Sequence, residues 1–169
     1  MKASTGDVFS NNTVIVNHTS GIGILATVSV ATIATGGSFK NNIIYIDNVS
    51  AKAVVISNDG SDATFFNNDY YSNIAFSATA FAYQATVYAT FAEWLAAKET
   101  SALNVDPQFL SYPIDLRVPV SNSSLYHAGV YAGSENKDYR LRPYNVKPTI
   151  GAYEVTSRDK GVSRNTRVA

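Results

Sequence analysis

The sequence predicts an all-β fold, a β-solenoid in which strands of successive repeats pair in parallel, with one short α-helix and an irregular closing region. A Phe-x-Asn-Asn motif begins at Phe9, Phe39 and Phe65, so it recurs after 30 and 26 residues. A short β-prone run follows each motif. The repeat lacks a helical pattern long enough for a crossover, so equivalent strands are expected to stack in parallel.

Each repeat is predicted to contain strand, corner, strand, turn, strand and turn, over residues 1–83. The strand after each Asn pair is expected at residues 13–16, 43–46 and 69–72. A second apolar run follows at residues 24–30, 53–56 and 74–83, after turn-rich pieces. We expect four or five turns of the solenoid in all.

The Asn pair is predicted to form the corner between the first two strands of each repeat. Asn tolerates the left-handed region better than other residues with a side chain. One Asn of the pair can therefore turn the chain while its amide bonds to the equivalent Asn of the next turn. The alternative is that the pairs arise by chance in an Asn-rich chain.

A short helix is predicted after the repeats. Thr90 and Glu93 match a capping box, with Thr90 as the N-cap. Phe91, Trp94 and Leu95 fall on one face of the helix, which is expected to end near residue 98.

Residues 84–154, the helix included, are predicted to be the closing region of the same domain. All five prolines lie between residues 107 and 148, which favours irregular structure with a few strands. The last segment, residues 155–169, is a basic tail. A docking arm and an exposed, disordered tail are the two interpretations of its basic residues Arg158, Lys160, Arg164 and Arg167.

Composition excludes several classes of function. Thirteen basic side chains balance thirteen acidic ones, so no nucleic-acid partner is indicated. The chain has no cysteine, which excludes a thiolate metal site and a thiol nucleophile. Neither a signal peptide nor a membrane span is recognisable, and no cofactor is expected.

Four segments near the C-terminus, NVDPQFL, DLRV, SNSSLYHAG and KPTIGAYE, resemble the end of right-handed parallel β-helix proteins of the pectate-lyase-like superfamily. The residues that carry the resemblance are Asp106, Pro107, Phe109, Asp115, Arg117, Ala128, Gly129, Ile150, Gly151, Ala152, Tyr153 and Glu154. Ser124, His127 and Thr149 depart from the family's motifs. The resemblance implies a right-handed parallel β-helix that is extracellular, on a cell surface or in a virion.

The family includes polysaccharide lyases and hydrolases as well as adhesins and phage tailspikes, so catalysis has to be weighed separately. A lyase needs a base and a cation on one face, yet residues 9–83 contain only Lys40 and Lys52. A hydrolase needs neighbouring carboxylates. The candidates in the repeats are Asp47, Asp59, Asp62 and Asp69; Asp59 and Asp62 are also the candidates for a calcium ion. A polysaccharide-degrading enzyme, or a fragment of one, remains the alternative.

Tyrosines offer the better binding candidates. If Val14, Val16, Ile44 and Ile46 face the core, a period of two residues places Ile15, Tyr45 and Tyr71 on the outside as a column. Exposed Tyr on a rigid sheet can stack sugar rings or dock partner chains. The alternative is that the column only stabilises the sheet.

The sequence therefore favours a non-catalytic, rigid β-helix module that contacts glycans or partner subunits. Eight residues precede Phe9, too few to cover one turn of the solenoid. We therefore expect protein subunits, or further turns, at the N-terminal face, and the basic tail to bind a partner.

Overall fold

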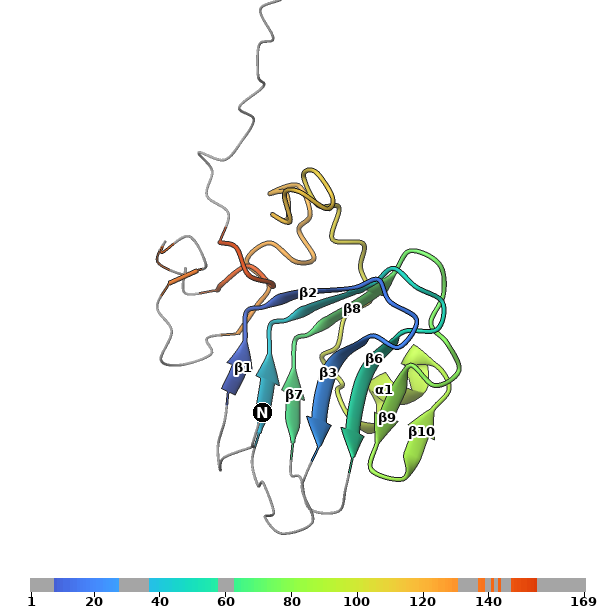
Figure 1. The fold of residues 1–169 in the computed structure, drawn as a ribbon. Coiled ribbons are helices and arrows are strands. Elements are labelled where there is room, and N and C mark those ends of the chain that lie inside the picture. Colours follow the sequence, from blue (N-terminus) through green and yellow to red (C-terminus); the bar gives the residue numbers. More distant parts are fainter. Residues whose placement is uncertain are drawn as a thin grey trace, which may run out of the picture.

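The computed structural model describes residues 8–27, 37–57, 63–130, 137–138, 141, 143 and 147–154. The protein is all-β, with three mainly parallel sheets and one short helix (Figure 1). The first sheet has the order β1 (Val8–Ser10), β4 (Ser38–Lys40), β7 (Thr64–Phe66). The second has the order β2 (Thr13–Val16), β5 (Ile43–Ile46), β8 (Asp69–Ser72). The third contains β3 (Ile22–Thr27), β6 (Lys52–Ser57) and β9 (Phe81–Tyr83), and β10 (Thr86–Tyr88) pairs antiparallel with β9.

Each repeat contributes one strand to each sheet, so the strands form layers: β1–β3 are the first layer, β4–β6 the second and β7–β9 the third. The register confirms the predicted repeat, because Phe9 pairs with Phe39 and Phe39 with Phe65 in parallel strands. Within the described residues, three layers are complete, fewer than the four or five turns expected. Beyond them, a single parallel bridge joins Leu103 to Asp69.

The second apolar run of the third repeat is shorter than predicted. A strand was expected within residues 74–83, but β9 begins at Phe81 and turns precede it. The turn at Ser77 is closed by a hydrogen bond from Ala80 N–H to its carbonyl, and Ser and Asn side chains there favour turns. The equivalent runs of the first two repeats lie in β3 and β6; residues 28–30 are outside the described part.

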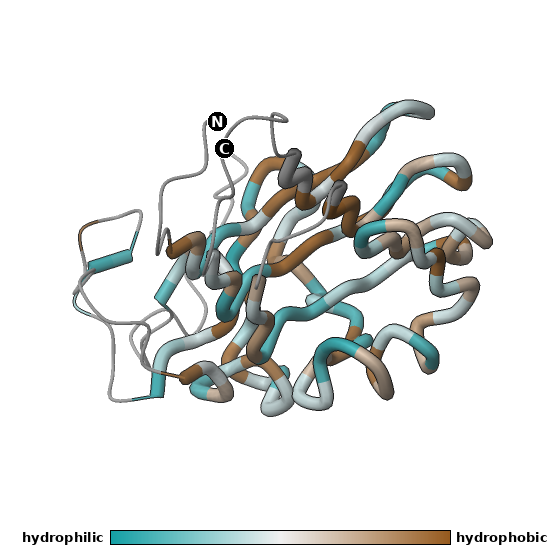
Figure 2. The backbone as a smooth tube through the Cα atoms, turned by 90° about the horizontal axis from the view of Figure 1, so that it is seen from below, coloured by the Kyte–Doolittle hydropathy of each residue, from teal (hydrophilic) through white to brown (hydrophobic). Residues whose placement is uncertain are grey.

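The three Phe side chains form a column inside the molecule. Ring centroids are 6.0 Å apart between Phe9 and Phe39, and 5.2 Å apart between Phe39 and Phe65. Phe65 is buried, whereas the other two are partly exposed. Hydrophobic stretches run through the middle of the molecule, where this column joins the apolar residues of β5 and β6 (Figure 2).

The two residues of each Asn pair have different roles at the corner. The first residue turns the chain with a positive φ, 55° at Asn11, 54° at Asn41 and 51° at Asn67. The second residue makes the ladder: Asn12 Nδ2 donates to Asn42 Oδ1, and Asn42 Nδ2 donates to the equivalent oxygen of the next layer. The expectation that one Asn does both is therefore wrong, since the turning residue points its amide elsewhere.

Asn42→Ala is expected to lower the free energy of unfolding by about 2 to 3 kcal/mol, because it leaves buried polar groups unpaired. Asn42 is fully buried; its Oδ1 accepts from the backbone and the amide of Asn12, and its Nδ2 donates to Phe9 O and to Asn68. Urea denaturation measures the change. Asn17→Ala, on an exposed residue, is the control and should cost under about 0.5 kcal/mol; equal losses would contradict a structural ladder.

The predicted helix is confirmed as α1 (Phe91–Ala97). The Thr90 side chain accepts a hydrogen bond of 3.2 Å from Glu93 N–H, as in a capping box. Trp94 is buried, and Phe91 and Leu95 pack against the same core cluster. The helix thereby covers the apolar end of the third layer, beside β9 and β10 (Figure 1).

The closing region contributes the strand β10, and after α1 its described residues form isolated bridges, as at Ser111 and Asp115, where a few strands were predicted. It returns along the outer face of the second sheet, and in Figure 1 its yellow-to-red segment lies above β2 and β8. Gly151 N–H bonds to Asn41 O at 2.8 Å, and Ala152 N–H bonds to Thr13 Oγ1 at 3.0 Å. Gly151 has φ 101°, and a Cβ there would lie 2.9 Å from that Thr13 oxygen. The segment ends against the first layer.

Candidate functional site

The predicted column of Ile15, Tyr45 and Tyr71 has the expected register across β2, β5 and β8. Its expected exposure is wrong for Tyr45, which is only 9% exposed. The closing region covers this face and forms a second apolar cluster with it. The closing region contributes the buried residues Val118, Leu125 and Ile150 to this cluster. The second sheet is consequently packed on both faces, and Ile15 and Tyr71 are partly buried against the same cluster.

An aromatic cluster remains at the margin of this covered face. It consists of Tyr45, Tyr71, Phe109 and Tyr112. The centroid of Tyr45 lies 5.6 Å from that of Tyr71, 5.6 Å from that of Phe109 and 5.0 Å from that of Tyr112. The four rings come from three parts of the chain, and Tyr45 and Tyr71 belong to the second sheet, which fixes their orientation. Tyr112 is 38% exposed and presents the cluster to solvent.

Asp47 joins the aromatic cluster to the neighbouring turns. Its carboxylate accepts from Tyr112 Oη at 2.8 Å and from Asn73 Nδ2 at 2.6 Å. Burial, the hydrogen bond to Asp47 and the charge of Asp47 raise the pKa of Tyr112 to about 12. Burial and the charge of Asp106 raise the pKa of Tyr71. These hydroxyls therefore stay protonated at neutral pH beside carboxylates that accept hydrogen bonds.

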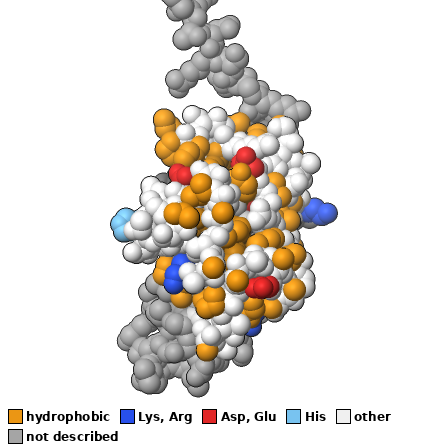
Figure 3. All heavy atoms as spheres, turned by 90° about the vertical axis from the view of Figure 1, so that its right-hand side faces the viewer, with side chains coloured by type: hydrophobic (Ala, Val, Ile, Leu, Met, Phe, Trp, Pro, Cys, Tyr) orange, Lys and Arg blue, Asp and Glu red, His pale blue; other side chains and the backbone are white. Residues whose placement is uncertain are grey.

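Exposed apolar side chains lie close in sequence to the residues of the cluster and its hydrogen-bond partners. Ile114, which is 89% exposed, and Leu110 are each two residues from Tyr112; Val49 is two residues after Asp47, and Ile74 follows Asn73. Figure 3 faces the side of the molecule that bears these turns, and hydrophobic side chains gather over it with few charged groups between them. A surface of this kind suits a partner with apolar faces and hydroxyl groups.

Two further carboxyl groups, those of Asp69 and Glu99, are buried in the third layer. Asp69, one of the candidate carboxylates, is buried; its Oδ1 accepts from Val105 N–H at 2.9 Å and its Oδ2 has no hydrogen-bond partner among the described residues. Glu99 ends the Asn ladder, because its Oε1 accepts from the backbone and the amide of Asn68, and its Oε2 accepts from Tyr70 Oη. Burial raises the pKa of both groups to about 7. Their burial keeps them from a polymeric substrate.

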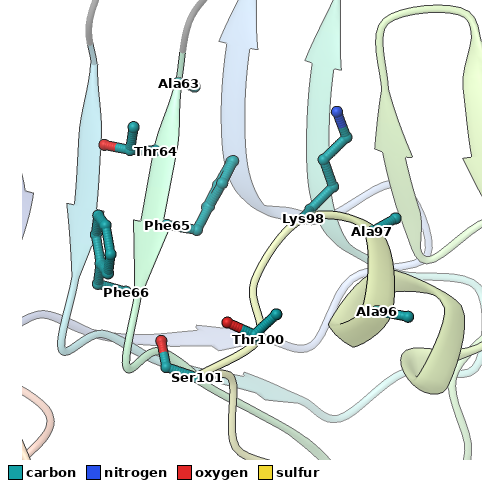
Figure 4. Close-up of a pocket in the computed structure, with 9 residues that line it drawn as sticks. All are labelled: Ala63, Thr64, Phe65, Phe66, Ala96, Ala97, Lys98, Thr100 and Ser101. Carbon is teal, nitrogen blue, oxygen red and sulfur yellow. The ribbon is translucent and has the colours of Figure 1, made fainter.

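A cavity of about 250 Å³ opens between β7 and the end of α1 (Figure 4). Its lining combines Phe65 and Phe66 with small side chains such as Ala96 and Ser101. Lys98, at its rim, places Nζ 3.7 Å from the centroid of the Tyr83 ring. The lining contains no carboxylate and no histidine, so the cavity brings together no acid–base pair.

Most of the other residues singled out in the sequence lie outside the described part of the structure. Asp59 and Asp62 lie outside the described residues, as do the tail residues Arg158, Lys160, Arg164 and Arg167. Asp47, the remaining candidate for catalysis, is bound to Tyr112 and Asn73 as described above. Among the described ranges, no three His, Asp or Glu side chains are arranged to hold a metal ion.

Two of the three positions that depart from the motifs, His127 and Thr149, contact one buried carboxylate. Glu154 is buried, and it accepts from Thr149 N–H at 2.9 Å and lies 3.3 Å from His127 Nε2. Glu154 N–H in turn donates to Asp138 at 3.0 Å. His127 and Thr149 thus hold the carboxylate at the end of the closing region.

Sequence reasoning missed Phe109 and Tyr112 as members of the candidate binding surface. Phe109 was noted only within the DPQF segment, and Tyr112 carries no local signal, because its neighbour Asp47 is 65 residues away in the chain. Glu99 was missed for the same reason, since the Asn ladder that it ends has no Glu in its repeat.

No protein-family model matches the chain, and comparisons with curated proteins and with solved structures likewise find no match. Over the described residues, none of the helical structure is long and apolar enough to span a bilayer.

Proposed function

We propose that the chain is a right-handed parallel β-helix module whose closing region seals its C-terminal side. Three observations support this: the parallel register between successive repeats in each sheet, one strand per sheet in each repeat, and the Asn ladder at the corner. Such a module is rigid, because each layer is hydrogen-bonded to the next throughout. It belongs to an extracellular, cell-surface or virion protein.

The module acts as a non-catalytic surface that binds a glycan at the aromatic cluster. The observation that carries this proposal is the partly exposed Tyr112 ring, held by Asp47 and by the Tyr45 and Phe109 rings. An aromatic ring stacks on the apolar face of a sugar, and adjacent carboxylates accept bonds from its hydroxyls. Asp47 and Asp106 would repel the carboxylate of a uronate, so the fitting ligand is a neutral glycan.

Tyr112→Ala is expected to weaken binding of a neutral oligosaccharide about tenfold, because a lost stacking contact is worth about 1.4 kcal/mol. Isothermal titration calorimetry with cello- and chito-tetraose measures it. Tyr112→Phe, which keeps the ring, should retain most of the affinity.

The matched control is Phe66→Ala, which removes an exposed ring on β7, outside the aromatic cluster. It should leave the affinity unchanged. Unchanged affinity of the Tyr112→Ala chain would contradict the proposal. The absence of binding of either oligosaccharide to the unaltered chain would contradict it as well. Cleavage of either sugar would favour the enzyme alternative instead.

A further inference from the structure

The Asn ladder has a direction. At each layer, the backbone N–H and the Nδ2 of the second Asn donate to the side-chain oxygen of the equivalent residue one layer further along the chain. Asn68 repeats this arrangement with Glu99 Oε1. Glu99 thereby closes the ladder at the third layer, because a carboxylate accepts and has no N–H group to donate onward.

The opposite end of the ladder is open among the described residues. Asn12 Oδ1 occupies the position of the double acceptor, yet it receives none of the described hydrogen bonds. The Nδ2 of Asn42 reaches back to Phe9 O in the preceding layer, whereas the Nδ2 of Asn12 turns to Ser10 O in its own layer. Asn12 thus lacks the neighbour that Asn42 and Asn68 have.

Within the described residues, the strands of the first layer also have no neighbouring strand at this end. β1, β2 and β3 are the outer strands of their sheets. Asn12 O accepts from Ile43 N–H and Val16 O accepts from Asp47 N–H, so in β2 the even-numbered residues face β5. The peptide groups of Thr13 and Ile15 consequently point to the outer edge. The outer edges of β1, β2 and β3 and the acceptor Asn12 Oδ1 thus lie at the same end of the molecule.

We propose that the outer edge of the first layer, Val8–Val16, is an interface for a further polypeptide layer that runs parallel to it and places an Asn beside Asn12. The backbone N–H and the amide of that Asn would donate to Asn12 Oδ1, as the ladder does within the chain. Strand addition to an open edge supplies the remaining main-chain hydrogen bonds.

A second copy of this chain fits the edge less well. Two first layers brought face to face by a twofold axis would set one Asn12 Oδ1 against the other, acceptor against acceptor, with their strands antiparallel. Stacking in the head-to-tail direction meets the third layer, where α1 and Glu99 cover the other end. The polarity of the ladder therefore selects a different segment with the same Asn-Asn corner.

The test adds to the full chain a synthetic peptide with the sequence of residues 38–47, SFKNNIIYID, which contains two strands and the corner of one layer. Amide hydrogen exchange by NMR reports the outcome residue by residue. Exchange at Thr13 and Ile15 is expected to slow at least tenfold, while Val14 and Val16, already paired with β5, change little. A matched peptide with the change N42D replaces the donating amide by a carboxylate, and it should bind at least tenfold more weakly.

Four results would overturn the inference. Unchanged exchange at Thr13 and Ile15 would show that the edge takes no such layer. Equal binding of the N42D peptide would show that the ladder does not select the partner. Protection of the same amides without peptide at all concentrations would show that the chain itself occupies the edge. Protection only at concentrations where sedimentation detects a dimer would show that a second copy occupies it.

Discussion

Raising the pH from 5 to 8 is expected to lower the free energy of unfolding by several kcal/mol. Burial raises the pKa of Asp69 and of Glu99 to about 7 in the folded protein, well above the ordinary values of 3.8 and 4.5. Each group therefore holds its proton in the folded state at a pH where the unfolded chain has lost it. The stability that this contributes is fully present below the unfolded pKa and is lost as the pH rises to about 7.

The size of the change in the free energy of unfolding follows from the width of the pH interval over which only the folded state holds the proton. One pKa unit corresponds to about 1.4 kcal/mol, so between pH 5 and 7 each carboxyl group contributes on the order of 3 kcal/mol. Urea denaturation at pH 5, 6, 7 and 8 measures the slope. A free energy of unfolding that is constant or rises across this range would contradict the protonated state of both groups.

Two variants separate the contributions. Glu99→Gln keeps an oxygen that accepts from Asn68 and adds an amide that can donate to Tyr70 Oη, so the ladder stays closed without a titrating group. Asp69→Asn keeps an acceptor for Val105 N–H. Each substitution is expected to remove about half of the pH dependence. Asn17→Ala, on an exposed residue that does not titrate, serves as the control and should leave the slope between pH 5 and 8 unchanged.

The sequence was informative where structure depends on local residue patterns. The Phe-x-Asn-Asn repeat predicted the layers and the register, because an Asn with positive φ can form each corner and a column of Phe rings needs one Phe per layer. The capping box predicted α1 in the same way, since Thr90 and Glu93 lie three residues apart.

The sequence was less informative where packing joins distant segments. A period of two residues places Tyr45 on the outer face of β5, but it cannot show that the closing region returns over that face. The contacts that bring it back, such as Asn41 to Val130 and Thr13 to Ala152, span 89 and 139 residues. For this reason the candidate site centres on Tyr112, because the closing region packs over the column of Ile15, Tyr45 and Tyr71.

Replacing Trp94 by Ala is expected to produce the largest loss of stability among single substitutions in the core. Trp94 is fully buried; its ring stacks on Phe81 at 5.4 Å and meets Phe65 at 5.1 Å and Tyr88 at 5.7 Å edge to face. No side chain nearby can fill the space of an indole, so a cavity should remain. Such a change costs about 3 to 5 kcal/mol.

Phe9→Ala is the control for Trp94→Ala, at the opposite end of the aromatic core. The Phe9 ring is partly exposed and, among the described residues, its one ring contact is with Phe39, at 6.0 Å, so a loss of about 1 to 2 kcal/mol is expected. Urea denaturation of both variants, followed by tryptophan-independent far-ultraviolet circular dichroism, gives the comparison. Equal losses would mean that α1 does not seal the third layer. A larger loss for Trp94→Ala would instead show that packing at the third layer contributes more to stability than packing at the first. Removing the indole exposes Phe65 and Phe81 together, whereas the strands of the first layer have no outer neighbour among the described residues.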